Sequence, residues 1–196
     1  MNNIAHQDAL NIPLDKRSRY LRKMVVKTLE SGKRAHLGSA MSIMELIRVL
    51  YDDFLRYDIT NLKDHNRDRF ILSKGHGCLA QYVVLADKGF FDKKELLRFC
   101  HADSILGGHP EYGKIPGVEA STGSLGHGIP IGVGMALAAK LQNRKSRVII
   151  IVGDGETNEG SVWEAAMSAV KHKLSNLTVI IDYNKIQSYG FVSEVL

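Results

Sequence analysis

Cysteine, tryptophan and proline are scarce in this chain, which contains two, one and four of them in 196 residues. Two cysteines, Cys78 and Cys100, cannot form a disulfide framework, so we expect a reducing compartment, the cytoplasm. The sequence also lacks an apolar run of about 18 residues, which excludes a membrane-spanning helix. Its first 20 residues have no apolar segment behind a basic start, so we expect no secretory leader.

Positive charge is in modest excess, with 26 Lys and Arg against 21 Asp and Glu and a formal net charge of +5. The densest basic run, residues 16–23, overlaps a helical apolar stripe formed by Leu21, Met24, Val25 and Leu29. A solvated helix face explains such a run. No interleaved aromatic residues or known nucleic-acid motif accompany it, so we predict neither a nucleic-acid partner nor a membrane partner.

The order of apolar segments predicts an α/β fold. Residues 148–152 have the pattern of a buried strand and residues 177–182 that of a second strand, and a helix at about 161–173 connects them. Strand, helix, strand implies a parallel pair, and hence a parallel sheet flanked by helices on both faces. A further strand is expected at 69–73. Because no linker or internal repeat is visible, we expect residues 1–196 to form a single domain.

Two local patterns set expected helix boundaries. Ser42 followed by Glu45 forms a capping-box pattern, which predicts that a helix begins there. A second helix is predicted at 79–87. The glycine-rich residues 104–134 have the composition of a loop that leads into a helix at Met135.

Polar residues follow both of the paired strands. Gly153, Asp154 and Gly155 end the first strand, and Asn184 follows the second. Ligands of parallel sheets bind at the carboxyl ends of the strands. The glycines allow a ligand to approach closely, and the following helix start suits an anion such as a diphosphate. A dinucleotide fingerprint fails because it needs glycine at Asn158, and no GxxxxGK[ST] sequence is present.

Asp154 and Asn184 are about 30 residues apart, an interval that fits strand, turn, helix and strand. Each side chain supplies a hard oxygen, and with a main-chain carbonyl they could hold Mg²⁺ or Ca²⁺. In the alternative interpretation Asp154 caps a turn and Asn184 ends a strand. These two residues alone do not separate the two interpretations.

GDG followed about thirty residues later by Asn resembles the thiamine diphosphate-binding motif, and further segments resemble the N-terminal domain of the transketolase family. These segments follow the family order: AHLG at 35–38, DRFILSKGH at 68–76, GHPE at 108–111, STGSLGHG at 121–128 and GDGETNEG at 153–160. The resemblance runs from about residue 15 to the last residue. It implies a thiamine diphosphate-binding fold, of which this chain is a diphosphate-binding domain that lacks its usual C-terminal part.

The resemblance also implies ligands for the cofactor. Asp154, Asn184 and the carbonyl of Ile186 would bind Mg²⁺, with Ca²⁺ as an alternative. The residues that would contact thiamine diphosphate itself are Gly123, Leu125, Gly153, Asp154, Gly155, Glu159 and Asn184. Glu159 would do so at a subunit interface, near a partner's glutamate. An exposed carboxylate in the first turn of a helix explains Glu159 equally well.

Three histidines, His36, His76 and His109, fall where the family places its acid–base and hydrogen-bonding groups. Imidazoles suit the proton transfers that accompany cleavage and formation of a ketose. His127 stands where many family members carry glutamine, so its role is open.

The resemblance implies the N-terminal subunit of a split transketolase, which would transfer a two-carbon ketol unit from a ketose phosphate to an aldose phosphate. A C-terminal subunit with the pyrimidine-binding domain would be its partner, in a homodimer or heterotetramer. One alternative is another thiamine diphosphate-dependent carboligase, such as a 1-deoxyxylulose-5-phosphate synthase relative, although GHPE at 108–111 fits it less well. The other is a non-catalytic cofactor-binding remnant, which has no reason to retain Asp154, Asn184 and the three histidines.

Overall fold

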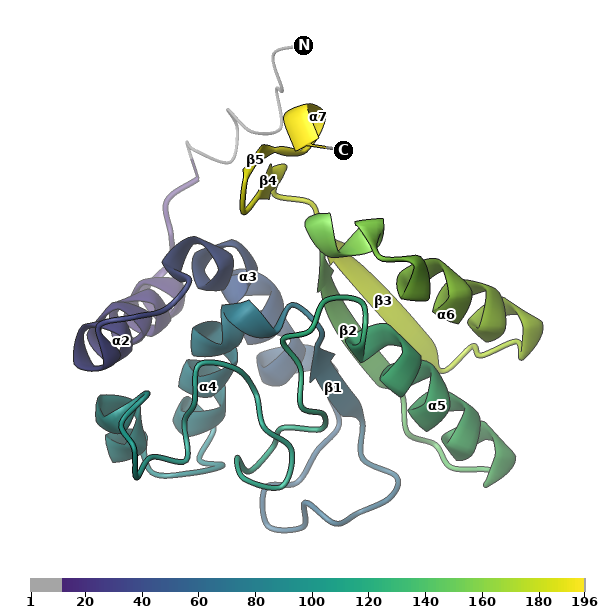
Figure 1. Ribbon diagram of the computed structural model, residues 1–196. Coiled ribbons are helices and arrows are strands. Elements are labelled where there is room, and N and C mark those ends of the chain that lie inside the picture. Colours follow the sequence, from purple (N-terminus) through teal and green to yellow (C-terminus); the bar gives the residue numbers. More distant parts are fainter. Residues whose placement is uncertain (1–11, 196) are drawn as a thin grey trace.

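The computed structural model describes residues 12–195 and is built around a parallel sheet (Figure 1). Its strands, in the spatial order in which they pair, are β1 (Arg69–Leu72), β2 (Val148–Gly153) and β3 (Leu177–Asp182). Both pairings are parallel, which confirms the prediction from the sequence. Leu72 pairs with Ile151 and Gly153 pairs with Asp182, so the carboxyl ends of the strands meet at one edge of the sheet.

Helices cover both faces of the sheet, as expected. They are α2 (Lys16–Gly32), α3 (Leu37–Val49), α4 (Cys78–Asp87), α5 (Gly128–Leu141) and α6 (Gly160–Lys171). Successive strand residues point to opposite faces. Ile149 and Ile151 therefore belong to the core cluster that also contains residues of α2, α3 and α4, whereas Ile150 and Val152 belong to the cluster with residues of α5 and α6. Burial on both sides explains why the sequence of β2 is continuously apolar.

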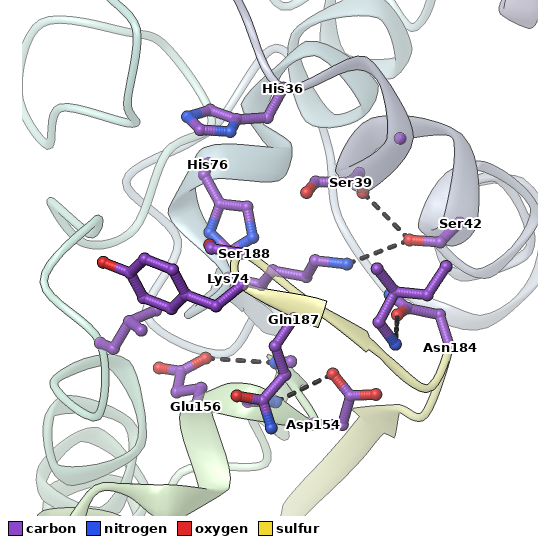
Figure 2. A pocket seen from close by; sticks show the side chains of 16 residues that line it. His36, Ser39, Ser42, Lys74, His76, Asp154, Glu156, Asn184, Gln187 and Ser188 are labelled. Carbon is purple, nitrogen blue, oxygen red and sulfur yellow. Dashed lines mark hydrogen bonds between the residues drawn. The ribbon is translucent and has the colours of Figure 1, made fainter. Parts of the chain in front are cut away.

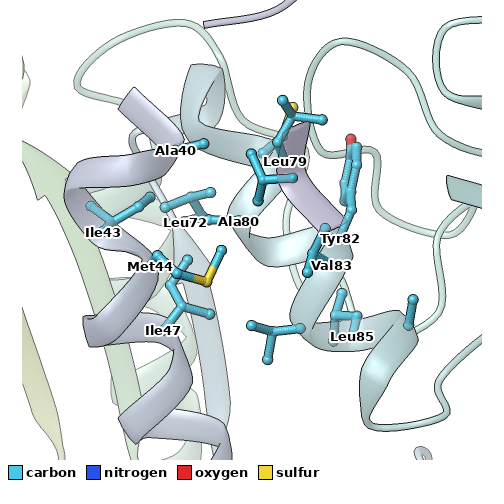
Figure 3. Packing of buried hydrophobic residues seen from close by; sticks show 14 of the residues in the cluster. Ala40, Ile43, Met44, Ile47, Leu72, Leu79, Ala80, Tyr82, Val83 and Leu85 are labelled. Atoms are coloured by element: carbon cyan, nitrogen blue, oxygen red, sulfur yellow. The ribbon is translucent and has the colours of Figure 1, made fainter. Parts of the chain in front are cut away.

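The larger core cluster lies where α3 meets α4 (Figure 3). Ile43, Met44 and Ile47 of α3 and Leu79 and Val83 of α4 are all fully or almost fully buried there. Interlocked apolar side chains of this kind fix the position of both helices relative to β1. The start of α3 and the turn after β1 are thereby held close together.

Short elements complete the chain. They are η1 (Leu50–Phe54), η2 (Gly75–Gly77), η3 (Lys93–Arg98), η4 (Gly155–Asn158), β4 (Ile186–Gln187), β5 (Gly190–Phe191) and α7 (Val192–Val195). β4 and β5 form an antiparallel hairpin that the sequence did not predict. It follows directly after the carboxyl end of β3 (Figure 1).

The predicted helix start at Ser42 is wrong, because α3 begins at Leu37 with His36 as its N-cap residue. The Ser42 hydroxyl instead donates to the carboxylate of Asp182, at 2.7 Å. Glu45 accepts a hydrogen bond from Arg22 of α2 at 2.9 Å. Both residues of the capping-box pattern thus serve tertiary contacts.

The predicted start of the helix that follows the glycine-rich segment is also wrong, since α5 begins at Gly128 and not at Met135. Its glycine content reflects close packing. A Cβ atom on Gly132 would lie 2.3 Å from Cδ1 of Ile150 in β2. A segment that resembles a loop in composition is therefore the first half of a helix pressed against the sheet.

The basic run on α2 is only partly a solvated face. Arg17 pairs with Asp52 at 3.0 Å and with Asp87 at 2.5 Å, and so connects α2 to η1 and α4.

Across residues 12–195, no helix is both long enough and apolar enough to cross a bilayer. The expectation about a leader concerns the first residues, of which 1–11 lie outside the described residues.

Two glycines of α5 allow a test of this packing. Gly132→Ala should lower the free energy of unfolding by about 1–3 kcal/mol, because the new methyl group overpacks the buried contact with Ile150. Gly134→Ala should raise it by about 0.5–1 kcal/mol, because no atom of residues 12–195 lies within 4 Å of its Cβ position and alanine favours a helix. Urea unfolding measures both. Equal effects of the two substitutions would contradict the close approach of α5 to β2.

Candidate functional site

A cavity of about 440 Å³ lies at the carboxyl edge of the sheet (Figure 2). The start of α3, the turn after β1, the GDG turn after β2 and the segment after β3 supply its walls. This is the edge at which parallel sheets bind ligands. The residues predicted from the two strand ends are therefore brought together.

The three predicted metal ligands, Asp154, Asn184 and Ile186, all line the cavity. Asp154 is 7% exposed, and its oxygens accept hydrogen bonds from the backbone N–H groups of Gly155 at 2.8 Å and Lys185 at 2.7 Å. It does cap the turn, but a carboxylate has about four lone-pair sites and keeps capacity for a cation. Oδ1 of Asn184 accepts from the N–H of Ile186 at 2.9 Å and likewise keeps a second lone pair.

Within residues 12–195 no three His, Cys, Asp or Glu side chains gather as a metal cluster. A metal at this edge would therefore need the mixed set of carboxylate, amide and carbonyl oxygens that Asp154, Asn184 and Ile186 offer. Hard oxygens of this kind are typical ligands of Mg²⁺ and Ca²⁺. The donor set thus fits the implied ion.

Gly153 and Gly155 line the same cavity. A Cβ atom on Gly155 would lie 3.0 Å from the side chain of Gln187, which comes from the β4 strand. Nε2 of Gln187 is buried and has no hydrogen-bond partner in the described part of the chain. Because buried donors are almost always paired, this N–H group suits an oxygen of a bound anion. The cradle therefore fits a diphosphate.

Two predicted cofactor contacts are placed differently from each other. Leu125 lines the cavity, whereas Gly123 lies outside the lining. Gly123 has a φ angle of +142°, and a Cβ atom there would lie 2.6 Å from Cδ2 of His109. Glycine at this position thus gives room to the ring of His109.

His36 and His76 lie together in one wall of the cavity (Figure 2). Their ring centroids are 5.4 Å apart, with an interplanar angle of 72°. His109 is exposed and lies outside the lining, against Gly123. The structure therefore brings two of the three predicted histidines into the cavity and leaves the third beside it.

Burial is the main cause that lowers the pKa of His76 to about 4, and the nearby Lys74 ammonium, His36 and His109 contribute to that lowering. At neutral pH the ring is consequently uncharged. A neutral imidazole offers one N–H donor and one acceptor nitrogen. His76 is thus suited to hydrogen bonding and to accepting a proton.

Glu159 and His127 lie outside the cavity lining. Glu159 is exposed and occupies the N-cap position of α6, and its side chain makes no capping hydrogen bond to residues 12–195. His127 is exposed at the N-cap of α5, with Nδ1 3.0 Å from the carbonyl oxygen of Leu125. The interface role of Glu159 stays a prediction.

Sequence reasoning missed a buried ion pair in the cavity wall. The ammonium of Lys74 contacts the carboxylate of Asp182, and these side chains are 3% and 8% exposed. Lysine at the end of a strand has no pattern that marks it as buried. Asp182 could have been found, because it ends its strand in register with Gly153.

Glu156 is a second buried carboxylate that the sequence did not reveal. It is 2% exposed and accepts hydrogen bonds from the Ser73 hydroxyl, from the N–H of Gly126 at 2.9 Å and from the N–H of Gly153 at 3.2 Å. These bonds join the loop at Gly126, Ser73 after the end of β1 and the GDG turn. A glutamate in a polar turn is ordinarily exposed, so its type gave no signal.

Comparison with known proteins defines the class of this domain and then its family. Residues 15–196 match the family model described as transketolase, thiamine diphosphate binding domain. The chain therefore belongs to the transketolase family, as its thiamine diphosphate-binding domain. The resemblance and the α/β fold predicted from the sequence are confirmed.

Individual relatives agree with this assignment. The chain is 43% identical to one of the subunits of apulose-4-phosphate transketolase from Actinobacillus succinogenes, over 93% of this chain and 67% of that protein. It is 36% identical to 6-deoxy-6-sulfo-D-fructose transketolase subunit SqwG of a Clostridium species, over 94% and 67%. Transketolase from Leishmania mexicana superposes with a TM-score of 0.86 at 33% identity, over 91% of this chain and 28% of that one.

This chain thus spans about two thirds of the length of the two bacterial relatives. Both are named as subunits of transketolases. The alternative of a 1-deoxyxylulose-5-phosphate synthase relative is not favoured by these matches.

The lowered pKa of His76 predicts a pH dependence of stability. The pKa of about 4 lies below the ordinary value of 6.5, so between these values the unfolded chain binds more protons. The free energy of unfolding should therefore fall as the pH is lowered from 6.5 towards 4. In His76→Gln this part of the slope should disappear, as measured by urea unfolding of the cofactor-free chain at several pH values. The exposed His172→Gln is the control and should retain the slope of the parent, and a parental slope in His76→Gln would contradict the assignment.

Proposed function

We propose that this chain is the diphosphate-binding subunit of a two-polypeptide transketolase, which transfers a two-carbon ketol unit from a ketose phosphate to an aldose phosphate. The observation that carries the proposal is the cavity in which the GDG turn, Asn184, His36 and His76 meet. The thiamine diphosphate-binding domain family to which the chain belongs supports the choice of cofactor. A non-catalytic remnant would not need this assembly of donors and histidines.

In this proposal Mg²⁺, or Ca²⁺ in its place, would be held by the carboxylate of Asp154, the amide oxygen of Asn184 and the carbonyl oxygen of Ile186. The GDG glycines leave room for the diphosphate, and Nε2 of Gln187 donates to one of its oxygens. When bound, thiamine diphosphate would supply the electron sink that cleavage of the ketose requires. The protein contributes placement and fixed dipoles.

The histidines handle protons and orient hydroxyl groups of the sugar. His76, uncharged at neutral pH, can accept a hydroxyl proton on one nitrogen and donate a hydrogen bond from the other. His36 lies beside it, and the exposed His109 lies against Gly123, outside the cavity lining. Positioned acid–base groups of this kind typically contribute about 10²–10⁴-fold to turnover.

A second polypeptide that carries the pyrimidine-binding domain is part of the proposal. The names of the two bacterial relatives describe subunits, which supports such a partner. On α6 an exposed apolar stripe, spaced by helical turns, consists of Trp163 (61% exposed), Met167 (65%) and Val170 (78%). Exposed apolar patches of this kind are typical of protein–protein contacts, here in a homodimer or a heterotetramer.

The relatives' names support an anionic sugar as substrate, because one names a sugar phosphate and the other a sulfo sugar. We propose a phosphorylated ketose and aldose here. We also propose that the chain acts in the cytoplasm, as a single diphosphate-binding domain.

Reconstitution tests the proposed function. The chain alone, given Mg²⁺, thiamine diphosphate, a ketose phosphate and an aldose phosphate, should not transfer the two-carbon unit. Addition of the polypeptide with the pyrimidine-binding domain should produce transfer, detected by mass spectrometry of the sugar products. Sustained turnover by the pure chain, with no copurifying polypeptide, would contradict the split enzyme.

A variant at Asp154 tests the metal site. Asp154→Ala should weaken Mg²⁺-dependent binding of thiamine diphosphate by about 100-fold or more, since even residues behind a metal ligand typically contribute 10–100-fold. Isothermal calorimetry of the reconstituted protein measures this, and circular dichroism reports on the fold. Glu30→Ala, an exposed carboxylate on α2, is the control and should bind as the parent does. Parental affinity in Asp154→Ala would remove Asp154 from the metal site.

A further inference from the structure

A single oxygen atom of Asp182 is the shared acceptor of a hydrogen-bond network at the cavity wall, where Ser42, Lys74 and Asn184 line the cavity. Oδ2 of Asp182 accepts from the ammonium of Lys74, from the Ser42 hydroxyl at 2.7 Å and from Nδ2 of Asn184 at 3.0 Å. The Lys74 ammonium also donates to the Ser42 hydroxyl oxygen at 3.0 Å (Figure 2). Asn184 is therefore held by residues from the ends of β1 and β3 and from α3.

This contact orients the Asn184 amide together with the N–H of Ile186, which donates to Oδ1 of Asn184 at the other end. An ionised carboxylate only accepts hydrogen bonds, so the amide must turn its NH₂ group towards Asp182 and its oxygen away. The two ends of an amide have nearly the same size, and packing alone would not choose between them. The positive charge of Lys74 compensates the buried negative charge of Asp182, whose isolated burial would be costly.

The side chain of Lys74 crosses the edge of the sheet from the end of β1 to Asp182. We call this connection between Lys74 and Asp182 the strap. The Lys74 side chain starts after β1 and passes the end of β2, where a Cβ atom on Gly153 would lie 3.6 Å from Cδ of Lys74. It ends at Asp182, the last residue of β3. The strap thus ties the ends of the outer strands together and passes close to Gly153 of the GDG turn.

We propose that Lys74, Asp182 and Ser42 are positioning residues that aim the oxygen of Asn184 at the bound metal ion. The inference rests on the proposed function of Asn184 as a metal ligand and adds the residues that orient it. Partners behind metal ligands typically change metal affinity by about 10–100-fold. The network acts on the metal through Asn184, so its effect should depend on that residue.

A thermodynamic cycle tests this dependence. The pair variant Lys74→Met with Asp182→Leu removes both charges and the acceptor together, because removal of one partner would leave a buried charge unpaired. It is made in the parent and in Asn184→Ala. Mg²⁺ is titrated into each protein saturated with thiamine diphosphate, in the assembly that is active in reconstitution. Urea unfolding of the same proteins reports on stability.

In the parent, the pair variant should weaken Mg²⁺ binding by about 10–100-fold. In Asn184→Ala the same two substitutions should change Mg²⁺ binding by less than about 3-fold, because independent sites add and coupled sites do not. The change in the free energy of unfolding that the pair variant causes should be the same in the parent and in Asn184→Ala. A purely structural strap, or a direct contact of Lys74 with the cofactor, would weaken Mg²⁺ binding equally in both, and that result would overturn the inference.

Two controls separate this inference from the proposed function. Arg22→Met with Glu45→Leu removes an ion pair between α2 and α3 whose residues do not line the cavity, and it should leave Mg²⁺ binding unchanged. Asn184→Ala by itself should weaken Mg²⁺ binding. Parental affinity in Asn184→Ala would overturn the proposed metal site, and with it the inference, whereas equal losses in the cycle would overturn the inference alone.

Discussion

The register of the parallel sheet is the constraint on which the site depends. Gly153 pairs with Asp182, so the GDG turn and the segment with Asn184 leave the sheet at the same level. A slip of one residue would turn every side chain of a strand to the opposite face and exchange the contents of the two cores. The apolar residues that face both helical layers therefore also determine where Asp154 and Asn184 lie.

Each buried charged side chain at the carboxyl edge of the sheet has a nearby partner of opposite charge or hydrogen-bond donors. Lys74 and Asp182 neutralise each other, while Glu156 is held by two backbone N–H groups and a hydroxyl. Buried polar networks are rigid when every member is satisfied. Nε2 of Gln187 differs from these groups, because it is buried without a hydrogen-bond partner among residues 12–195 and its residue lines the cavity. The satisfied groups explain the shape of the edge, and the unsatisfied one marks where a ligand belongs.

Much of the fold could be predicted from the sequence because β2 is a continuous apolar run, β3 is largely apolar, and short polar turns follow both strands. The same argument located Asp154, Asn184 and Gly155, since turn residues at strand ends must meet. Contacts between distant segments could not be predicted in this way. Ser42 lies 140 residues from Asp182 in the chain, and its local pattern favoured a helix cap over that contact.

Buried lysine and glutamate side chains were missed for a related reason. Both types are ordinarily exposed, and only the three-dimensional arrangement shows that Lys74 has a carboxylate within reach and that Glu156 faces three donors. The family resemblance supplied residues that contact the cofactor, and physical patterns supplied the strand ends. The residues that hold those groups in place came from neither source.

The position of His109 shows how the core itself reaches into the site. Tyr82 donates to the carbonyl oxygen of Gly107 and Cys78 to that of Gly108, both at 3.1 Å. Both donors lie on α4, one helical turn apart and buried, so α4 holds two successive carbonyl groups just before the histidine. The ring then rests on Gly123, where a side chain would collide with it. Packing of α4 against α3 thus determines where His109 stands relative to His76, and the placement of a solvent-exposed imidazole depends on the apolar core.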